Sequence, residues 1–428
     1  MDWYNNGSSN CLTMVDKIAQ LNVTQIQFLP TFYWYDEGPI DPPADFNASC
    51  QGSDLSGYYC YNRFNSTRVE HWCYDRQGSY CPEVTQEGIN DLIENLGACM
   101  KRAVEYGMDL AVNTRIDDGR ALGGWRNTLD FDPLETYGNY TYVDAILLPI
   151  VEAVKIAAGP ATRVDFVLQG EMGATVFTHP YEWIDVKSTI LSNATSGSNA
   201  LDPDQLFFGM ALNNNKLCGC IGVGIVNFVD YMRAFPAEFE ATRDNFDTQG
   251  IYDVLMDYDF IGLSAYVPML SPNFTVCEFE GLMTRMDWEL SFYNVTLQDL
   301  LSAGKEIHFI EFGVGGGTSQ AGDTPARTAS EAAWYPYFGI FGAYSCENDP
   351  FEMCTLDEPS PVRDYRRFYF EQISKAIYPL TFGNATDLEA NPTAYYDPVI
   401  VETINRHNVE AASQANCIAT ASVDEDPF

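Results

Sequence analysis

The sequence predicts an α/β protein built as a (β/α)8 TIM barrel with cysteine-bearing loop insertions. Apolar, strand-like runs alternate with amphipathic, helix-like stretches, which is typical of a parallel sheet with helical crossovers. Six clear strands with room for two more fit an eight-stranded barrel better than an open doubly wound sheet. No GxGxxG motif follows the first strand, which argues against a dinucleotide-binding fold.

Each predicted strand is a short apolar run next to polar or turn residues. The six are residues 24–30 (TQIQFLP), 109–113 (DLAVN), 164–168 (VDFVL), 206–212 (LFFGMAL), 260–265 (FIGLSA) and 307–311 (IHFIE). Among the helix-like stretches, residues 89–107 (INDLIENLGACMKRAVEYG) repeat apolar positions every three or four residues and end on a glycine.

The first and last strands of the barrel are harder to place. The eighth is expected at residues 417–423 (CIATASV), and the first is either MDWY or part of a leader that is absent from the chain. We expect one domain over residues 1–428, with an insertion at 36–90 after strand two and a loop-rich insertion at 315–362 after strand seven.

The charge balance narrows the class of partner. The net charge is -37, from 60 acidic and 23 basic residues, so nucleic acid and anionic membrane are disfavoured and neutral or cationic partners are favoured. Aromatic residues at 14% and charged residues at 19% indicate a globular chain. No apolar run approaches the roughly 20 residues that a membrane span needs.

Cysteines and glycosylation motifs indicate a secreted glycoprotein. The 12 cysteines lie mostly in loop-like segments and lack CxxC spacing, which favours disulfides in an oxidising compartment. Acceptor motifs for N-linked glycans are predicted at Asn6, Asn22, Asn47, Asn65, Asn139, Asn193, Asn273, Asn294 and Asn384. We therefore expect an extracellular protein that carries N-linked glycans.

Two glutamates follow strands four and seven, where a (β/α)8 barrel places its chemistry. Glu171 lies in QGEMG and Glu311 in HFIEFGVGGG. Strands four and seven lie on opposite sides of such a barrel, so the two side chains are expected to converge above it. A retaining glycosidase needs this pair, one carboxyl as acid and one as nucleophile, about 5 to 5.5 Å apart. The alternative is that each glutamate caps or salt-bridges a loop.

Side chains that suit a sugar surround these strand ends. Aromatic faces stack on pyranose rings, and Arg, Asn and Asp bind hydroxyl groups, although buried aromatics are more often core residues. The predicted substrate-binding residues are Trp34, Tyr33, Asn113, Arg115, Asp117, Trp125, Arg126, Asn213 and His179. Tyr266 in LSAYVP is expected to donate its hydroxyl to the nucleophile.

Metal and serine chemistry are disfavoured. The four histidines, His71, His179, His308 and His407, show no HxH or HExxH spacing, and no GxSxG elbow is present. We therefore expect neither a cofactor nor a catalytic metal.

Several strand-end motifs together resemble glycoside hydrolase family 113 and its clan A relatives. They are LPTFYW, NTRIDDGRALGGWRNTLDFDP, VLQGEMG, DYDFIGLSAYVPML and KEIHFIEFGVG, between about residue 20 and residue 320. The resemblance implies a (β/α)8 retaining enzyme of the endo-β-1,4-mannanase type. It matches Glu171 to the acid/base, Glu311 to the nucleophile, Tyr266 to the tyrosine that supports the nucleophile, and Trp125 and Arg126 to a Trp-Arg pair.

The chain departs from that pattern at two places. Gly170 stands where a polar residue precedes the acid/base, and strand three reads NTRID where the pattern resembles KPHxD. Two hypotheses follow. The first is a secreted, mannanase-like retaining β-glycoside hydrolase that cleaves a neutral cell-wall polysaccharide. The second is a catalytically inactive, glycosidase-like structural glycoprotein of an extracellular coat or filament, in which self-assembly is possible.

Overall fold

The structure is a computed structural model that describes part of the 428-residue chain. The described residues are 4–5, 8–21, 23–36, 69–78, 80–120, 125–197, 199–213, 217–219, 237, 240, 243–265, 269, 272–274, 286–312, 329–334, 365 and 367–372. The description below concerns these residues.

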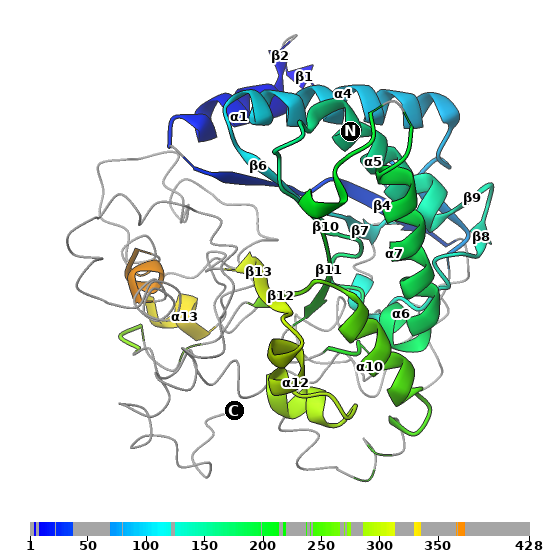
Figure 1. The fold of residues 1–428 in the computed structure, drawn as a ribbon, viewed down its shortest axis with the longest axis vertical. Coiled ribbons are helices and arrows are strands. Elements are labelled where there is room, and N and C mark those ends of the chain that lie inside the picture. Colours follow the sequence, from blue (N-terminus) through cyan, green and yellow to red (C-terminus); the bar gives the residue numbers. More distant parts are fainter. Residues whose placement is uncertain are drawn as a thin grey trace.

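A six-stranded parallel sheet forms the centre of the molecule (Figure 1). Its strands lie side by side in chain order, each hydrogen-bonded to the next: β3 (Gln25–Phe28), β6 (Asp109–Asn113), β10 (Val164–Val167), β11 (Leu206–Asn213), β12 (Phe260–Ala265) and β13 (Glu306–Phe312). All six predicted strands are confirmed, with boundaries that differ by no more than two residues.

Helices connect successive strands and cover the outer face of the sheet (Figure 1). This is the βαβ arrangement that the alternating pattern predicts. The crossover helices are α4 (Gln86–Glu105), α5 (Leu148–Ala157), α6 (Gly173–Thr178), α7 (Pro180–Ala194), α10 (Thr248–Asp257) and α12 (Leu297–Ser302). The hydroxyl of Thr85 caps the start of α4, and Gly107 with φ 79° follows its end, as the glycine in the sequence predicted.

The strands continue past the sheet on one side. β4 (Thr31–Tyr35) follows β3, and β7 (Arg115–Asp118) follows β6. Gln25 pairs with Asp109, and Thr31 pairs with Arg115. Both pairs join residues 84 positions apart, so β4 and β7 prolong the ladder of β3 and β6 in the same register. They thus extend upward from the carboxyl edge of the sheet.

The sheet curls into a barrel-like form. The side-chain amide of Gln27 in β3 donates to the carbonyl of Ile310 in β13 at 3.0 Å. These are the two edge strands of the sheet. A side chain of this length joins them only if the sheet bends round on itself. The fold is therefore α/β and barrel-like, while the two further strands of a full (β/α)8 barrel remain a prediction.

The inward-facing side chains of the lower strands are polar. Arg163 pairs with Asp165 at 2.8 Å and with Glu306 at 3.1 Å, and His308 contacts Glu306 at 2.7 Å. The bond to His308, followed by the charge of Arg163, lowers the pKa of Glu306 to about 2. Above them Val167, Ala211, Phe260 and Ile310 form a small apolar cluster.

The absence of a side chain at Gly209 makes room for the ring of Phe260 in that cluster. A Cβ on Gly209 would lie 2.0 Å from the ring of Phe260, so the ring occupies the space that a side chain at 209 would fill. The barrel interior is thus packed at this level. The polar residues at the carboxyl ends of the strands lie beyond this packed layer.

Several sequence predictions need correction or lie outside the described residues. Tyr4 and Asn5 (β1) pair with β2 (Ser8–Ser9) in a two-stranded sheet and not with the described six-stranded sheet, and residues 1–3 of the predicted strand MDWY lie outside the described residues. The predicted insertion 36–90 overlaps α4, which begins at Gln86, and its described part includes β5 (His71–Cys73), which pairs with β4. Residues 417–423 and most of 315–362 lie outside the described part.

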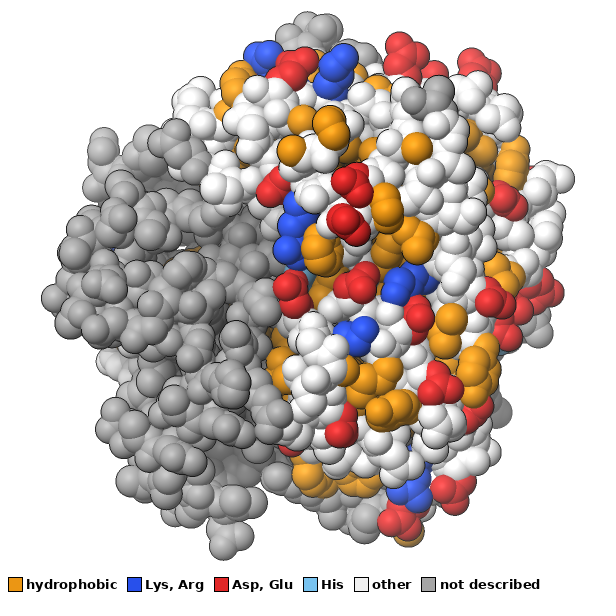
Figure 2. All heavy atoms as spheres, viewed as in Figure 1, with side chains coloured by type: hydrophobic (Ala, Val, Ile, Leu, Met, Phe, Trp, Pro, Cys, Tyr) orange, Lys and Arg blue, Asp and Glu red, His pale blue; other side chains and the backbone are white. Residues whose placement is uncertain are grey.

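One disulfide joins two helices, and a second closes a short loop. Cys11 of α1 (Asn10–Ala19) is bonded to Cys99 of α4, and Cys73 of β5 is bonded to Cys81. Cys218 is also disulfide-bonded. Among the described helices, none combines the length and apolar character of a membrane span. On the face shown in Figure 2, the described part of the chain carries many acidic side chains with fewer basic ones between them.

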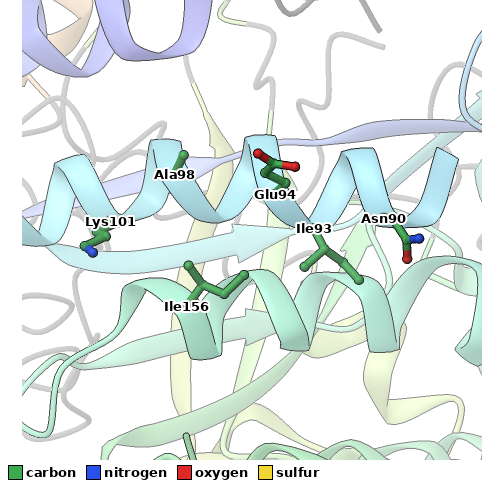
Figure 3. A pocket seen from close by; sticks show the side chains of 6 residues that line it. All are labelled: Asn90, Ile93, Glu94, Ala98, Lys101 and Ile156. Carbon is green, nitrogen blue, oxygen red and sulfur yellow. The ribbon is translucent and has the colours of Figure 1, made fainter. Parts of the chain in front are cut away.

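A shallow groove lies on the outside of the molecule, between α4 and α5 (Figure 3). It is lined by Asn90, Ile93, Glu94, Ala98, Lys101 and Ile156. Gly97 of α4 lets the two helices approach closely, since a Cβ there would be 3.2 Å from the carbonyl of Ala153. The groove belongs to the helical layer and not to the carboxyl edge of the sheet.

Candidate active site

The loop after β10 holds Glu171 in an unusual backbone conformation. Its φ is 59°, in the left-handed region that a residue with a side chain adopts at a cost of about 1–2 kcal/mol. Its N–H donates to the carbonyl of Ala211 in β11 at 3.1 Å, and the N–H of Ala211 donates to Gln169 at 3.1 Å. Two ladder bonds to β11 thus hold the strained residue, which is 6% exposed.

The glycines beside Glu171 allow the close contacts that the sequence predicted. A Cβ on Gly170 would be 2.3 Å from the carbonyl oxygen of Thr114, and one on Gly173 would be 1.9 Å from that of Leu217. Backbone atoms cannot move aside as a flexible side chain can. The loop is therefore packed directly against neighbouring backbone on both sides of the glutamate.

Three side chains contact the carboxylate of Glu171 through N–H groups. Trp125 Nε1 donates to Oε2 at 3.1 Å, and Arg126 Nη2 contacts the same oxygen at 2.6 Å. Asn213, at the end of β11, donates from Nδ2 to Oε1. Both carboxylate oxygens are thus bonded to donors that come from two other segments of the chain.

Glu311 approaches the same guanidinium from β13. Arg126 Nη2 lies 3.4 Å from Glu311 Oε1 and 2.6 Å from Glu171 Oε2. The two carboxylate oxygens can be no further apart than the sum of these contacts, about 6.0 Å. Carboxyl groups about 5–5.5 Å apart are typical of retaining glycosidases, whereas inverting ones need about 6.5–9.5 Å.

Arg126 is itself firmly anchored. It lies in the short helix η1 (Arg126–Thr128), its side chain is 8% exposed, and its Nε donates to the carbonyl of Gly170 at 2.9 Å. Nη1 contacts Asp117 at 3.3 Å, and Asp117 also pairs with Arg115 at 3.1 Å. Two arginines and three carboxylates therefore form one connected network above the sheet.

Burial and neighbouring charges shift the pKa of Glu311. Burial raises the pKa of this carboxyl, the charge of Arg126 lowers it, and the charge of Glu171 raises it again. Arg115 and Asp117 add smaller effects of opposite sign. The net result is a pKa above the usual range of a glutamate.

The aromatic residues of β4 alternate between two environments. Tyr33 is half-buried and pairs laterally with Asp117, while Arg76 lies 5.7 Å from the centre of its ring. Trp34, in contrast, is 4% exposed and belongs to the main hydrophobic core. The ring of Trp34 is packed in the core in this structure and not exposed to a ligand, so the structure gives no support to the prediction that it binds substrate.

Asn113 at the end of β6 is fully buried beside Gly170. Its Oδ1 would be 2.8 Å from a Cβ on that glycine. Within the described part of the chain neither amide atom of Asn113 has a hydrogen-bond partner. A buried amide of this kind calls for an ordered water or a ligand group as partner.

His179 lies away from the two glutamates. It follows α6, which separates it from the Glu171 loop, and its Nε2 lies 3.3 Å from Asp130. The hydrogen bond to the carboxylate of Asp130 raises the pKa of His179. The described contacts of His179 are with Asp130 and not with the glutamate pair, and its role in substrate binding stays a prediction. Tyr266 lies outside the described residues.

One group of possible metal ligands exists among the described residues. Ligand atoms of Asp132, His179 and Glu182, all half-buried, lie within 4.8 Å of one another. This spacing suits a divalent cation. The group sits around the α6–α7 junction and shares no residue with the network around Arg126.

Sequence reasoning missed two buried residues that shape the Glu171 loop. Gln169 Oε1 accepts from the N–H of Met172 at 2.8 Å, and Asn127 Oδ1 accepts from that of Gly173 at 2.8 Å. Both side chains are fully buried. Asn127 directly follows the Trp-Arg pair, and Gln169 lies two residues before Glu171. Their position beside those motifs was the only sequence feature that could have indicated a role in the site.

No protein-family model and no curated protein matches the chain. Solved structures to which it is similar include a GH113 β-1,4-mannanase, with 11% identity, a TM-score of 0.41, and coverage of 95% of this chain and 94% of that one. Another is the GH113 β-mannanase AaManA from Alicyclobacillus acidocaldarius, with 12% identity, a TM-score of 0.41, and coverage of 86% and 77%.

A third similar structure is a modular endo-β-1,4-mannanase of family 26 from Cellulomonas fimi, with 14% identity and a TM-score of 0.32. It covers 65% of this chain and 58% of that chain. Likenesses at these scores carry no argument about this chain, so its fold and site rest on the strand order and contacts described above. The GH113 structures are of the family that the strand-end motifs resemble.

Proposed function

We propose that the protein is a retaining β-glycoside hydrolase of the mannanase-like type that cleaves a neutral polysaccharide. One observation carries most of the proposal. Glu171 and Glu311 come from strands β10 and β13 of a curled parallel sheet, and both contact Arg126 Nη2, so their nearest oxygens are at most about 6.0 Å apart. This separation suits double displacement on one sugar.

Double displacement takes place in two steps, and the two carboxyl groups have different roles in each. One carboxyl protonates the glycosidic oxygen while the other attacks the anomeric carbon, and water then releases the glycosyl group with the first carboxyl acting as base. Arg115, Asp117, Tyr33 and Asn113 provide donors and acceptors for hydroxyl groups around this centre. The resemblance to family 113 assigns Tyr266 to support of the nucleophile.

The charge of the chain favours a neutral substrate, and its disulfides and glycan acceptor residues favour a location outside the cell. A net charge of -37 disfavours anionic polymers. We propose a secreted glycoprotein that acts on a cell-wall polysaccharide, because disulfides hold described segments together and the acceptor residues Asn139, Asn273 and Asn294 are exposed. Asn193 is half-buried, and the other predicted glycan sites lie outside the described residues.

The decisive experiment combines a substrate panel with matched variants. The protein is incubated with neutral β-linked polysaccharides, and the released sugars are separated and identified. Glu311→Gln and Glu171→Gln are expected to abolish turnover while leaving the circular dichroism spectrum unchanged. Glu152→Gln, an exposed glutamate paired with Lys155, is the control and should keep full activity. Full activity in either active-site variant would end the proposal.

A second candidate is the inactive structural glycoprotein of an extracellular coat or filament. The network itself favours it, because Arg126 bonds both carboxylates and the carbonyl of Gly170, as a purely structural ion cluster would. Under this reading the wild-type protein releases no sugar from any member of the panel. Self-association measured by analytical ultracentrifugation would then support the structural role.

A further inference from the structure

A β-bulge in β13 turns the side chain of Glu311 toward the inside of the barrel. Successive residues of β12 pair with Phe309 and with Glu311, so Ile310 is an extra residue in β13. Ile310 belongs to the apolar cluster inside the barrel, and strict alternation along the strand would therefore place Glu311 on the outer face. The bulge instead lets Glu311 reach Arg126, as bulges next to active sites often re-aim a side chain.

The neighbouring strand β12 is built to accommodate this bulge. A Cβ on Gly262 would lie only 3.0 Å from the side chain of Ile310, so the glycine leaves space for the extra residue. Two positions further along β12, the register places Ser264 directly beside Glu311.

Ser264 lies between two residues of the candidate site. It pairs laterally with Asn213 of β11 on one side and with Glu311 of β13 on the other. Asn213 donates to the carboxylate of Glu171, and Glu311 contacts Arg126. Laterally paired residues of parallel strands project from the same face of a sheet, so the side chain of Ser264 faces the interior between these two neighbours.

The hydroxyl of Ser264 is buried without a partner. Ser264 is 2% exposed, and within the described part of the chain its Oγ makes no hydrogen bond. The carboxylate of Glu311 accepts one hydrogen bond from the described residues, at Oε1, from Arg126 Nη2 at 3.4 Å. Buried polar groups in native proteins are paired with protein or with ordered water. Two groups that need a further partner therefore lie on adjacent strands.

We propose that Ser264 is a positioning residue that holds the carboxylate of Glu311 through one ordered water. Adjacent strands lie about 4.7–4.9 Å apart, and a water with two hydrogen bonds of about 2.8 Å bridges a gap of this size. The hydroxyl donates to the water, and the water donates to the carboxylate. This inference rests on the proposed function and deepens it, because it adds a residue that aims one of the two carboxyl groups.

The proposed bond favours the ionised form of Glu311. A donor to a carboxylate lowers its pKa, so removal of that donor raises it. The charged groups that face Glu311 among the described residues are Arg126, Glu171, Arg115 and Asp117. Ser264 is uncharged, so its replacement by alanine leaves these charges in place and removes only the hydroxyl.

Titration of Glu311 by NMR tests the bond without a substrate. The protein is labelled with glutamate that carries ¹³C at the side-chain carboxyl, and the signal that is lost in Glu311→Gln belongs to Glu311. We expect Ser264→Ala to raise the pKa of Glu311 by about 0.5–1 unit, which is a three- to tenfold change in its ionisation constant for one net hydrogen bond. An unchanged pKa would overturn the proposal.

Two further variants show whether the hydroxyl is the cause. Ser264→Thr keeps the hydroxyl and should keep the wild-type pKa of Glu311, and a shift as large as that of Ser264→Ala would contradict the proposal. Thr162→Ala is the matched control. It removes a buried hydroxyl that bonds to Gly159 on the amino-terminal side of β10, and it should leave the pKa of Glu311 unchanged.

Kinetics separate the positioning role from the proposed function. On a neutral β-linked polysaccharide, Ser264→Ala should lower kcat by about three- to tenfold and leave KM unchanged, because the hydroxyl acts on Glu311 and not on the bound sugar. A loss confined to KM would make Ser264 a sugar contact and overturn the positioning role. If the wild type releases no sugar while Ser264→Ala still raises the pKa of Glu311, the proposed function falls and the water-mediated bond stands.

Discussion

Replacing Arg126 with Met gives a direct measure of how strongly the network depends on one side chain. Arg126 and Glu171 are each 8% exposed and 2.6 Å apart, so the variant leaves a buried carboxylate without its cation. Breaking a buried ion pair by removing one partner costs about 3–5 kcal/mol. Arg115 is more exposed at 21%, and so is its partner Asp117 at 34%, so Arg115→Met should cost less than about 1 kcal/mol.

The cost of Arg126→Met should depend on pH. Without the guanidinium the pKa of Glu311, already raised by burial, rises further. A raised pKa in the folded state adds stability below the pKa of the unfolded chain, about 4.5, and this is lost as pH rises through the folded value. The free energy of unfolding, from urea titration followed by tryptophan fluorescence, should therefore differ more from wild type at pH 7 than at pH 4. An equal deficit at both pH values, or equal costs for the two arginine variants, would refute the reasoning.

Three further predictions concern the barrel. Gly209→Ala places a methyl group 2.0 Å from the ring of Phe260 and should lower the free energy of unfolding by about 1–3 kcal/mol; an unchanged urea midpoint would contradict the packing. Replacing Cys11 and Cys99 with Ser opens a disulfide that spans 88 residues and should cost about 2–4 kcal/mol in the same assay, with no loss arguing against the bond. Because the pKa of Glu306 is lowered to about 2, its contribution is present above about pH 4.5 and is lost as pH falls toward 2, so Glu306→Gln should flatten this part of the stability profile.

The strands of the barrel could be predicted because their pattern is strong. Residues 109–113 (DLAVN) and 260–265 (FIGLSA) each contain a short apolar stretch, and both are strands with the predicted bounds. Buried parallel strands have this pattern because helices cover the outer face and side chains fill the interior. The N-terminal residues carry no such run, and Tyr4–Asn5 pairs with Ser8–Ser9 and not with the sheet.

The aromatic cluster of β4 could not be assigned from sequence. Tyr33 and Trp34 are neighbours in the chain, so in a strand they face opposite sides. The direction depends on the register with β7, where Tyr33 pairs with Asp117 and Trp34 with Asp118. Only the pairing shows that Trp34 packs into the core while Tyr33 faces the side of Asp117.

The gathering of charges around Arg126 depends on contacts between segments that are distant in sequence. Glu171 and Glu311 could be picked out because each follows a strand run. Their shared partner could not, since the spacing of residues says nothing about which of several arginines reaches both. The left-handed backbone of Glu171 was equally hidden, because a residue with a side chain seldom adopts it. Strain of this kind is frequent at functional sites.

The configuration of the first sugar released tests the central claim most directly. The nearest oxygens of Glu171 and Glu311 are at most about 6.0 Å apart, below the roughly 6.5–9.5 Å between the carboxyls of inverting enzymes, so we expect the reaction to proceed by double displacement. Proton NMR of a β-linked substrate in the first minutes of digestion should show the β-anomer, before it equilibrates with the α-anomer. Initial appearance of the α-anomer would contradict the account.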